Sequence, residues 1–359
     1  MLDMKNRHNV EPSVLIPGEG ELAEKCRENG IQVIISKSYL WTYERRLKVR
    51  IKGFVKILLN KIYYERKILN LLKNKHFDII HTNSSVIETG SIIAQKLNIP
   101  HIWHIREYGI DDYKLYYLPP EFYVKKQYSK AAQIIAISNS VYSTYVYSHV
   151  ITQERNTRII YDGLKVPDEY TKTYAQDGRV NFCIVGILFE GKNQLTAIKA
   201  CAKLKALTQN FTLHIIGNDK GEYSDMLKDY VRTHGLEDNV KFWGFRYDVN
   251  EILRNMDVGL MLSRREAFGR VTVEYMLNYM PVIGVNSGAT PEIVDDGVTG
   301  YVCPLNDDEY IAAVMKKFID NPELLSQMGN KGRERAVKNF SLERNTDEIY
   351  ALYQEILSK

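Results

Sequence analysis

Ser263-Arg264-Arg265-Glu266-Ala267-Phe268-Gly269-Arg270-Val271-Thr272-Val273-Glu274 is the stretch that decides the fold, because it joins a strand pattern to a helix pattern. Residues 256–262 before it are mostly apolar, as in a buried strand, and the apolar residues after Gly269 recur with helical spacing. A turn between a strand and a helix offers free backbone N–H groups and the positive end of the helix dipole, which favours a phosphate there. Glu266 lies just before this turn, and Glu274 lies about two turns into the helix. Carboxylates in these positions accept hydrogen bonds from hydroxyl groups on either side of a phosphate, as in a nucleotide-sugar.

Short β-branched apolar runs alternate with helical patterns along the whole chain. The first half contains strand patterns at residues 13–16, 32–35, 78–81, 101–104, 133–137 and 157–160. The second half contains strand patterns at residues 180–185, 212–216, 240–242, 258–262, 281–285 and 300–302. This alternation predicts α/β architecture with parallel sheets. Two such series within 359 residues predict two Rossmann-like domains.

The polar segment 166–179 has no periodicity and is the expected linker. We therefore expect an N-terminal acceptor-side domain at residues 1–165 and a C-terminal nucleotide-sugar-binding domain at residues 166–341. The pattern of residues 342–359 predicts a helix that packs back on the first domain. Residues 1–10 have a helical pattern that runs directly into the first strand, so we expect the first strand-helix unit of the N-terminal domain to be missing.

Basic residues are concentrated between Lys37 and Lys75. This segment contains twelve Lys and Arg residues and only two acidic residues, Glu44 and Glu65. The total net charge is +4, so this segment carries +10 and the rest of the chain −6. Tyr and Trp residues interleave with the charges, which indicates either contact with an anionic membrane surface or a solvated helix face, with equal weight. We expect no nucleic acid as a partner, because no nucleic-acid-binding motif accompanies the charge.

Four cysteines lie scattered without CxxC spacing, which predicts buried free thiols and no disulfide framework or zinc site. The chain opens without a signal peptide and has no apolar run of transmembrane length. We therefore expect a cytoplasmic protein, with peripheral contact at the inner membrane face.

Other polar turns follow strand patterns in the second half. Gly186 ends the strand at 180–185, and Lys192 precedes the next helix, where its charge suits a diphosphate. Phe245 and Arg246 follow the strand at 240–242, and Ser263 follows the strand at 258–262. In open α/β sheets, ligands bind at the carboxyl ends of the strands, so we expect these residues to share one site.

Together these motifs resemble the retaining nucleotide-sugar glycosyltransferases of family 4, also called glycosyl transferases group 1, which have the GT-B fold. The resemblance covers most of the chain and is strongest over residues 180–302. It implies two Rossmann-like domains facing across a cleft, and an enzyme of the hexosyltransferase type. The donor is expected to be a UDP-sugar, and the acceptor a glycan or a lipid-linked molecule in surface polysaccharide biosynthesis. No metal cofactor is expected.

The resemblance also implies roles for particular residues. Glu266 would bind hydroxyls of the donor sugar, Phe268 and Gly269 would present backbone N–H groups to the donor, and Glu274 would bind the ribose. Lys192 would stabilise the diphosphate leaving group next to Gly186, while Phe245 and Arg246 would lie along the base and Ser263 beside the donor. On the acceptor side, His104 would face the reacting sugar, with Arg106 and Glu107 next to it. The catalytic set is then Glu266, Lys192 and His104.

One departure from the family pattern is Ile187, which stands where an arginine usually follows the glycine. One of two cations expected on the diphosphate is therefore missing from that position. This departure keeps open a second function, a catalytically impaired nucleotide-binding partner of an active glycosyltransferase. A nucleotide-sugar epimerase on the same fold is a further alternative.

Overall fold

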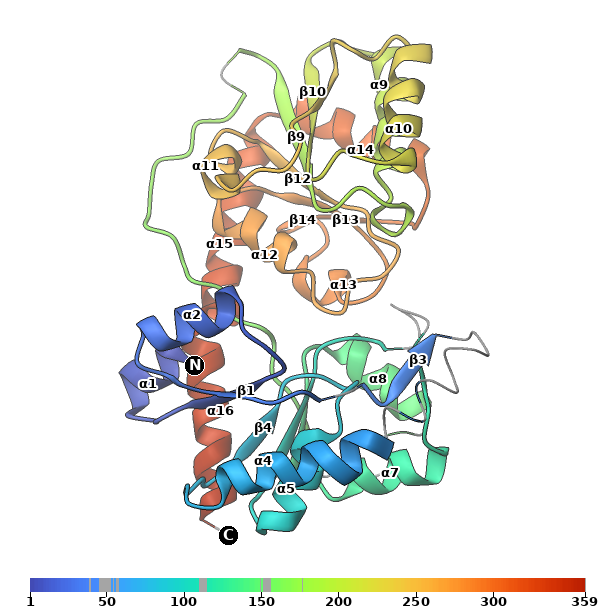
Figure 1. Cartoon of the computed structure of the whole chain (residues 1–359). Helices are drawn as coiled ribbons and strands as arrows, with labels where there is room; N and C mark the ends of the chain where they lie inside the picture. Colours follow the sequence, from blue (N-terminus) through green and yellow to red (C-terminus); the bar gives the residue numbers. More distant parts are fainter. Residues whose placement is uncertain are drawn as a thin grey trace. The chain divides into compact units, whose positions relative to one another are not determined.

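Two runs of parallel strands organise the computed structural model, one in each of two units (Figure 1). The structure describes residues 1–38, 40–44, 53, 55, 58–109, 115–148, 150, 156–175 and 177–358. Unit 1 comprises Met1–Tyr161 and Asn345–Lys359, and unit 2 comprises Asp162–Arg344. The α/β prediction with parallel sheets is confirmed in both units.

Unit 1 is built on four parallel strands in the order β4-β5-β7-β8. These are β4 (Ile80–Thr82), β5 (His101–Ile105), β7 (Gln133–Ala136) and β8 (Thr157–Ile159). Two smaller sheets accompany them: parallel β1 (Ser13–Ile16) and β2 (Gln32–Ile35), and antiparallel β3 (Thr42–Glu44) and β6 (Leu115–Tyr117). The β3–β6 pair was not predicted, because neither of its strands contains a β-branched apolar run.

Helices enclose the sheets of unit 1 on both faces. They are α1 (Leu2–His8), α2 (Glu21–Glu28), the π-helix η1 (Asn60–Tyr64), α4 (Glu65–Leu72), α5 (Thr89–Leu97), α7 (Glu121–Ser129), α8 (Asn139–Tyr147) and α16 (Leu342–Leu357). On one face Ile349 and Leu352 of α16 pack on Ile102 and Ile135 of the sheet. On the other face the apolar sides of α4 and α5 cover β2 and β4.

Unit 2 contains a six-stranded parallel sheet in the order β11-β10-β9-β12-β13-β14. The strands are β9 (Val180–Val185), β10 (Phe211–Ile216), β11 (Val240–Phe242), β12 (Val258–Met261), β13 (Val282–Val285) and β14 (Gly300–Cys303). The strand patterns of both halves predicted strands that the structure contains, with ends shifted by one or two residues. All four cysteines are buried free thiols, as predicted.

Helices cover both faces of the unit 2 sheet (Figure 1). They are the 3-10 turn η3 (Glu190–Lys192), α9 (Gln194–Lys205), α10 (Glu222–Thr233), α11 (Val249–Leu253), α12 (Arg270–Leu277), α13 (Thr290–Ile293), α14 (Asp308–Asp320) and α15 (Glu323–Phe340). The core of unit 2 is formed by apolar side chains of the strands together with α9, α10, α14 and α15. A core of this size fixes the strand ends firmly, and the loops that follow those ends carry the candidate site.

Residues 166–175, within the expected linker, lie along unit 2. The Tyr170 hydroxyl donates to the carbonyl of Asn278 at 3.1 Å, and the Tyr174 hydroxyl donates to the carbonyl of Tyr279 at 2.7 Å. Lys172 donates to the carbonyl of Leu253 at 2.9 Å. These bonds hold the segment on the surface of unit 2, although it has no regular secondary structure.

Candidate functional site

The site lies where the order of strands in unit 2 reverses, between β9 and β12. These strands pair over only two residues each, Phe182 with Val258 and Cys183 with Gly259. Beyond this point the backbone N–H of Val185 donates to the hydroxyl of Tyr275 at 2.8 Å. The Tyr275 side chain therefore separates the two strands at their carboxyl ends, which opens the sheet edge where ligands bind in this architecture.

Tyr275 reaches this position because Gly259 has no side chain. A Cβ atom on Gly259 would lie 2.2 Å from the Tyr275 ring, so the ring packs directly on the backbone of β12. Tyr275 was not predicted from the sequence. Gly259 inside an apolar strand was the signal, since a glycine there often marks a close approach by another group.

The loops that follow the strands interlock through their backbones. A Cβ on Gly217 would lie 1.9 Å from the carbonyl oxygen of Gly186, and a Cβ on Gly288 would lie 2.5 Å from that of Glu266. The backbone N–H of Ala289 donates to the carbonyl of Glu266 at 2.9 Å. The loop after β13 therefore fixes the backbone of Glu266 without blocking its side chain.

Lys192 and Glu266 form an ion pair at this edge of the sheet. Lys192 ends η3 after β9, and Glu266 lies in the loop after β12, so the fold brings together residues 74 positions apart in the sequence. The Lys192 side chain lies over Gly186, where an added Cβ would be 3.7 Å from its Cε atom. The predicted neighbours Gly186, Lys192 and Glu266 thus meet at the gap between β9 and β12.

The N-terminus of α12 begins in the same loop. Gly269 is its N-cap with φ +88°, and no side chain caps the helix. The side chain of Phe268 is buried and packs edge-on against Phe340, with ring centroids 5.7 Å apart. Burial of this ring fixes the Phe268–Gly269 backbone at the start of the helix, in a place suited to an anion.

Glu274 lines a pocket of about 200 Å³ beside α12. The pocket is formed by Leu164, Lys165, Pro167, Asn250, Arg270, Glu274, Leu277 and Asn278. Burial raises the pKa of the Glu274 carboxyl, and the charge of Arg270 opposes that rise. Arg270 also pairs with the buried carboxylate of Asp162 at 3.1 Å, an ion pair that the sequence analysis did not foresee.

The remaining expected donor-side residues differ in accessibility. Ser263 is buried at the end of β12, so its side chain supports the loop. Phe245 is 63% exposed and lies edge-on to the exposed Tyr247 in the loop after β11. Arg246 pairs with Asp248, its Nε donating at 2.8 Å. This loop therefore places the exposed rings of Phe245 and Tyr247 at the carboxyl edge of the sheet. The guanidinium of Arg246 lies in the same loop, with its charge balanced by Asp248.

In unit 1 the structure places His104 inside the sheet, where it is 2% exposed. Its Nδ1 lies 3.2 Å from Nε2 of His81, and Nδ1 of His81 lies 2.6 Å from the hydroxyl of Tyr353. Burial lowers the pKa of both imidazoles, that of His81 to about 4, so both rings are neutral at pH 7. Nε2 of His104 is buried and has no hydrogen-bond partner among the residues that the structure describes, and the role of His104 toward the reacting sugar stays a prediction.

Glu107 is held firmly at the carboxyl edge of the unit 1 sheet. Its Oε1 accepts from the hydroxyls of Ser84 and Ser85, both at 2.8 Å, and from the backbone N–H of Ser85 at 2.7 Å. Its Oε2 accepts from the backbone N–H of Arg106 at 3.1 Å. A carboxylate with this many donors is a fixed acceptor, so Glu107 stays a candidate for acceptor binding, with Arg106 beside it.

Among the residues that the structure describes, no group of three or more His, Cys, Asp and Glu side chains is arranged to hold a metal ion. Among the same residues, no helix has both the length and the apolar character needed to span a membrane.

Residues 168–335 match the family model described as glycosyl transferases group 1. The chain is 31% identical over 160 residues to the N-acetyl-alpha-D-glucosaminyl L-malate synthase of Bacillus anthracis, covering 45% of this chain and 41% of that protein. It is 25% identical over 242 residues to the capsular polysaccharide biosynthesis glycosyltransferase CapM of Staphylococcus aureus, covering 64% and 63%. The chain thus spans less than two thirds of the length of these curated relatives.

Solved structures support the same fold. The crystal structure of Anabaena HepE in complex with UDP has a TM-score of 0.79 and 18% sequence identity, covering 99% of this chain and 94% of that chain. A likeness at this identity establishes the fold, which is the GT-B arrangement of two Rossmann-like domains expected from the sequence.

Proposed function

Because residues 168–335 match the family model described as glycosyl transferases group 1, we propose that unit 2 binds a nucleotide-sugar and that the chain transfers the sugar to an acceptor. The observation that carries this proposal is the Lys192–Glu266 pair beside the uncapped N-terminus of α12. A cation and the positive end of a helix suit a diphosphate, and the carboxylate beside them suits sugar hydroxyls.

The proposed reaction is transfer with retention at the anomeric carbon. The bond from the anomeric carbon to the phosphate oxygen breaks, and its electron pair stays on that oxygen. The acceptor oxygen forms the new bond from the same face, and its proton passes to a phosphate oxygen of the leaving group. Lys192 and the dipole of α12 offset the charge that develops on the diphosphate.

Other residues of unit 2 orient the donor in this proposal. Glu266 accepts hydrogen bonds from the transferred sugar, and Glu274 accepts them from the ribose in the pocket beside α12. Phe245 offers its exposed ring to the base. We propose a UDP-sugar as donor, because Anabaena HepE, which shares the fold, was solved with UDP.

We propose a glycan or lipid-linked acceptor in surface polysaccharide assembly, by analogy with the capsular polysaccharide relative of Staphylococcus aureus. Glu107 and Arg106 of unit 1 are the residues we assign to the acceptor. Glu107 is fixed by Ser84 and Ser85, so it would orient an acceptor hydroxyl at little cost in entropy.

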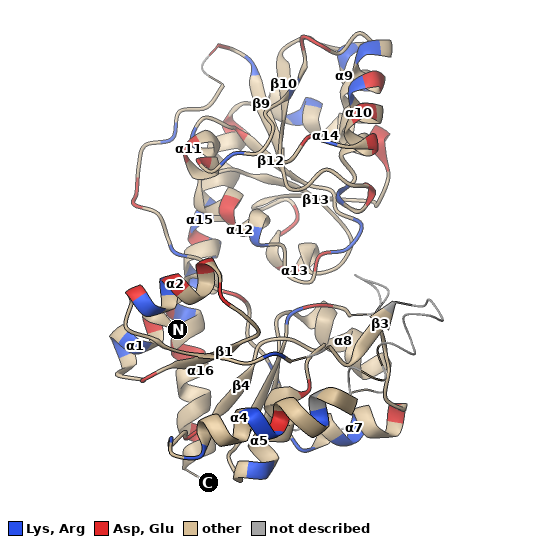
Figure 2. Ribbon diagram, in the orientation of Figure 1, with Lys and Arg blue, Asp and Glu red and all other residues tan. Residues whose placement is uncertain are grey.

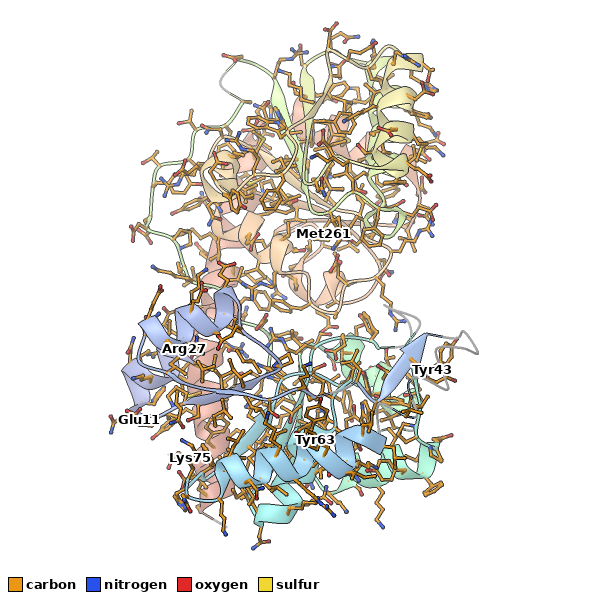
Figure 3. All side chains as sticks on the ribbon, viewed as in Figure 1. Glu11, Arg27, Tyr43, Tyr63, Lys75 and Met261 are labelled. Atoms are coloured by element: carbon orange, nitrogen blue, oxygen red, sulfur yellow. The ribbon has the colours of Figure 1, made fainter. Side chains whose placement is uncertain are left out.

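An anionic membrane surface is the proposed partner of residues 37–75, within which the structure describes a helical segment from Leu58 to Leu72. Five apolar residues of unit 1 are 49 to 61% exposed at positions that recur every three or four residues: Val55, Leu58, Leu59, Ile62 and Tyr63. Basic residues follow on α4 and just after it (Figure 2), and Tyr63 and Lys75 are labelled in Figure 3. Arg45, Arg46, Lys48, Arg50, Lys52 and Lys56 lie outside the described residues.

Apolar and basic side chains together on one helical segment are typical of interfacial membrane binding. Vesicles of phosphatidylglycerol and phosphatidylcholine test this surface by flotation. The double variant Leu58→Glu/Ile62→Glu is expected to stay in solution, whereas Leu207→Glu, which alters an even more exposed leucine of unit 2, is expected to float with the vesicles. Equal flotation of the double variant and the wild type contradicts the assignment.

The transfer reaction itself is tested with a panel of UDP-, GDP- and ADP-sugars in the presence of candidate glycan and polyprenyl-phosphate acceptors. Release of nucleoside diphosphate together with a glycosylated product supports the proposal, and the anomeric coupling constant of that product by NMR reports retention or inversion. Conversion of the donor to its epimer without acceptor would favour the epimerase alternative.

The exposed Ile187 is the one observation that favours a catalytically impaired binding partner. Its side chain is 59% exposed next to Gly186, so no cation comes from this position. In that case the protein would bind nucleotide, and every donor and acceptor pair would fail to react.

A further inference from the structure

The charge balance of the proposed donor site is incomplete. Lys192 is already neutralised by Glu266, and Ile187 contributes no charge. A departing nucleoside diphosphate brings at least two negative charges into the same loops, and the dipole of α12 is equivalent to only about half a charge. A further cation is therefore needed for this site to stabilise the leaving group.

Three arginines follow β12, two in the loop and one as the first residue of α12: Arg264, Arg265 and Arg270. Arg270 is paired with the buried carboxylate of Asp162. Arg265 already makes an interaction of its own. Arg264 is exposed, and it forms no ion pair with any residue that the structure describes.

The backbone of Arg264 is fixed from two sides. Its N–H donates to the carbonyl of Gly191 at 2.9 Å, which attaches it to the turn that carries Lys192. Its carbonyl accepts from the hydroxyl of Ser287 in the loop after β13. Arg264 therefore joins the loops of β9, β12 and β13 at the point where the sheet opens.

Tyr223 of α10 lies at the start of α9, where its hydroxyl accepts the N–H of Leu195 at 3.4 Å. Burial raises the pKa of Tyr223, and the hydrogen bond from Leu195 and the charge of Arg264 oppose that rise. The backbone bond of Arg264 to Gly191 attaches this residue to the loop that runs from Gly186 to Lys192.

We propose that Arg264 is a catalytic residue that contacts the diphosphate of the donor and supplies the charge that Ile187 lacks. The proposal rests on the function proposed above. Arg264 takes part in no bond change: it stabilises the phosphate oxygen that receives the electron pair when the anomeric bond breaks. The planar guanidinium also offers paired N–H donors to phosphate oxygens, which Lys192 cannot do.

Calorimetric titration with UDP, UMP and uridine tests this assignment. Arg264→Gln is expected to weaken the binding of UDP by about 10- to 100-fold, since a charge-assisted hydrogen bond is lost, while the binding of uridine is unchanged. Ile187→Arg in the Arg264→Gln background is expected to recover most of the loss. Lys220→Gln, which removes the same charge from an exposed site in the loop after β10, is the matched control and is expected to bind UDP as the wild type does.

Each other outcome overturns the assignment. If Arg264→Gln binds UDP as tightly as the wild type, or if the loss appears in Arg265→Gln instead, Arg264 is not the second cation. An equal loss for uridine and UDP means that the substitution disturbs the loops, which circular dichroism and thermal unfolding check independently. If the wild type binds none of UDP, GDP and ADP, the proposed function fails together with the assignment.

Discussion

The carboxyl ends of the strands in the two units contrast sharply. In unit 2, loops with glycines at close approaches, such as Gly217 and Gly288, bring backbones together and leave Lys192 and Glu266 partly exposed at the edge. In unit 1, side chains fill the equivalent space, and His104 is buried against His81. A polar residue near a strand end is therefore accessible to a ligand where the neighbouring loops place only backbone beside it. Where aromatic and imidazole rings pack beside it instead, it is buried.

The rings of unit 1 form one connected cluster. Trp103 stacks on Tyr128 with ring centroids 4.2 Å apart, and Trp41 stacks on Trp103 at 5.4 Å. The indole N–H groups donate to the carbonyls of Ser84 and Ser85, each at 2.8 Å. The cluster therefore fixes the serines that hold Glu107, so the aromatic core of unit 1 serves its candidate acceptor residue indirectly.

Removal of the Glu266 carboxylate is expected to have the largest effect on turnover. Glu266→Ala is expected to lower kcat by about 10²- to 10³-fold, as for the loss of a group that orients the reacting sugar. The binding of UDP should not weaken, because Glu266 faces the sugar and its removal leaves the charge of Lys192 available to the diphosphate. Initial rates of UDP release measure the effect, and a loss of less than a few-fold would remove Glu266 from the active site.

Lowering the pH is expected to destabilise unit 1 through its buried histidines. Their pKa values lie below the ordinary 6.5 in the folded chain, that of His81 at about 4 and that of His101 at about 3. The unfolded chain therefore binds more protons below pH 6.5, so stability is fully present above pH 6.5 and is lost as the pH falls toward 4. Each such histidine contributes a slope of about 1.4 kcal/mol per pH unit in that window.

Urea unfolding at pH 7.5, 5.5 and 4.5 measures this loss. In a Trp243→Phe variant, the fluorescence comes from Trp41 and Trp103 of unit 1 alone. Glu88, whose pKa burial raises, opposes part of the slope. A free energy of unfolding for unit 1 that stays level from pH 7.5 to 4.5 would contradict the burial of neutral histidines.

Gly288→Ala tests the interlocked loops of unit 2. Its φ of +58° already strains a side chain, and the new Cβ would lie 2.5 Å from the carbonyl oxygen and 2.6 Å from the nitrogen of Glu266. We expect unit 2 to lose about 1–3 kcal/mol of stability, with a drop in turnover as Glu266 shifts. Gly18→Ala is the control, because a Cβ there meets nothing within 4 Å. Equal thermal midpoints for the two variants would show that the loops are not packed as described.

Phe245→Ala has the smallest expected effect. The ring is exposed, so its loss should leave the thermal midpoint unchanged. Stacking on a base contributes about 0.5–1.5 kcal/mol, which corresponds to a few-fold weaker binding of UDP in calorimetry. Unaltered binding would place the base elsewhere than on this loop.

Much of unit 2 could be predicted from the sequence, because its signals are local. The strand patterns, Gly186 with Lys192, and the turn between Glu266 and Glu274 each lie within a few residues of one another. The burial of His104 could not be predicted, since it depends on His81 from β4 and Tyr353 from α16. The Arg270–Asp162 pair likewise joins residues 108 positions apart, and no pattern in either segment indicates the other.

A calorimetric comparison of one carboxylate from each unit tests the central claim most directly. Wild type, Glu274→Gln and Glu107→Gln are titrated with UDP under the same conditions. We expect micromolar binding by the wild type, a loss of about tenfold or more in Glu274→Gln as its hydrogen bonds to the ribose are weakened, and no change in Glu107→Gln. Loss of binding in Glu107→Gln with full binding in Glu274→Gln would place the nucleotide on unit 1 and contradict the account.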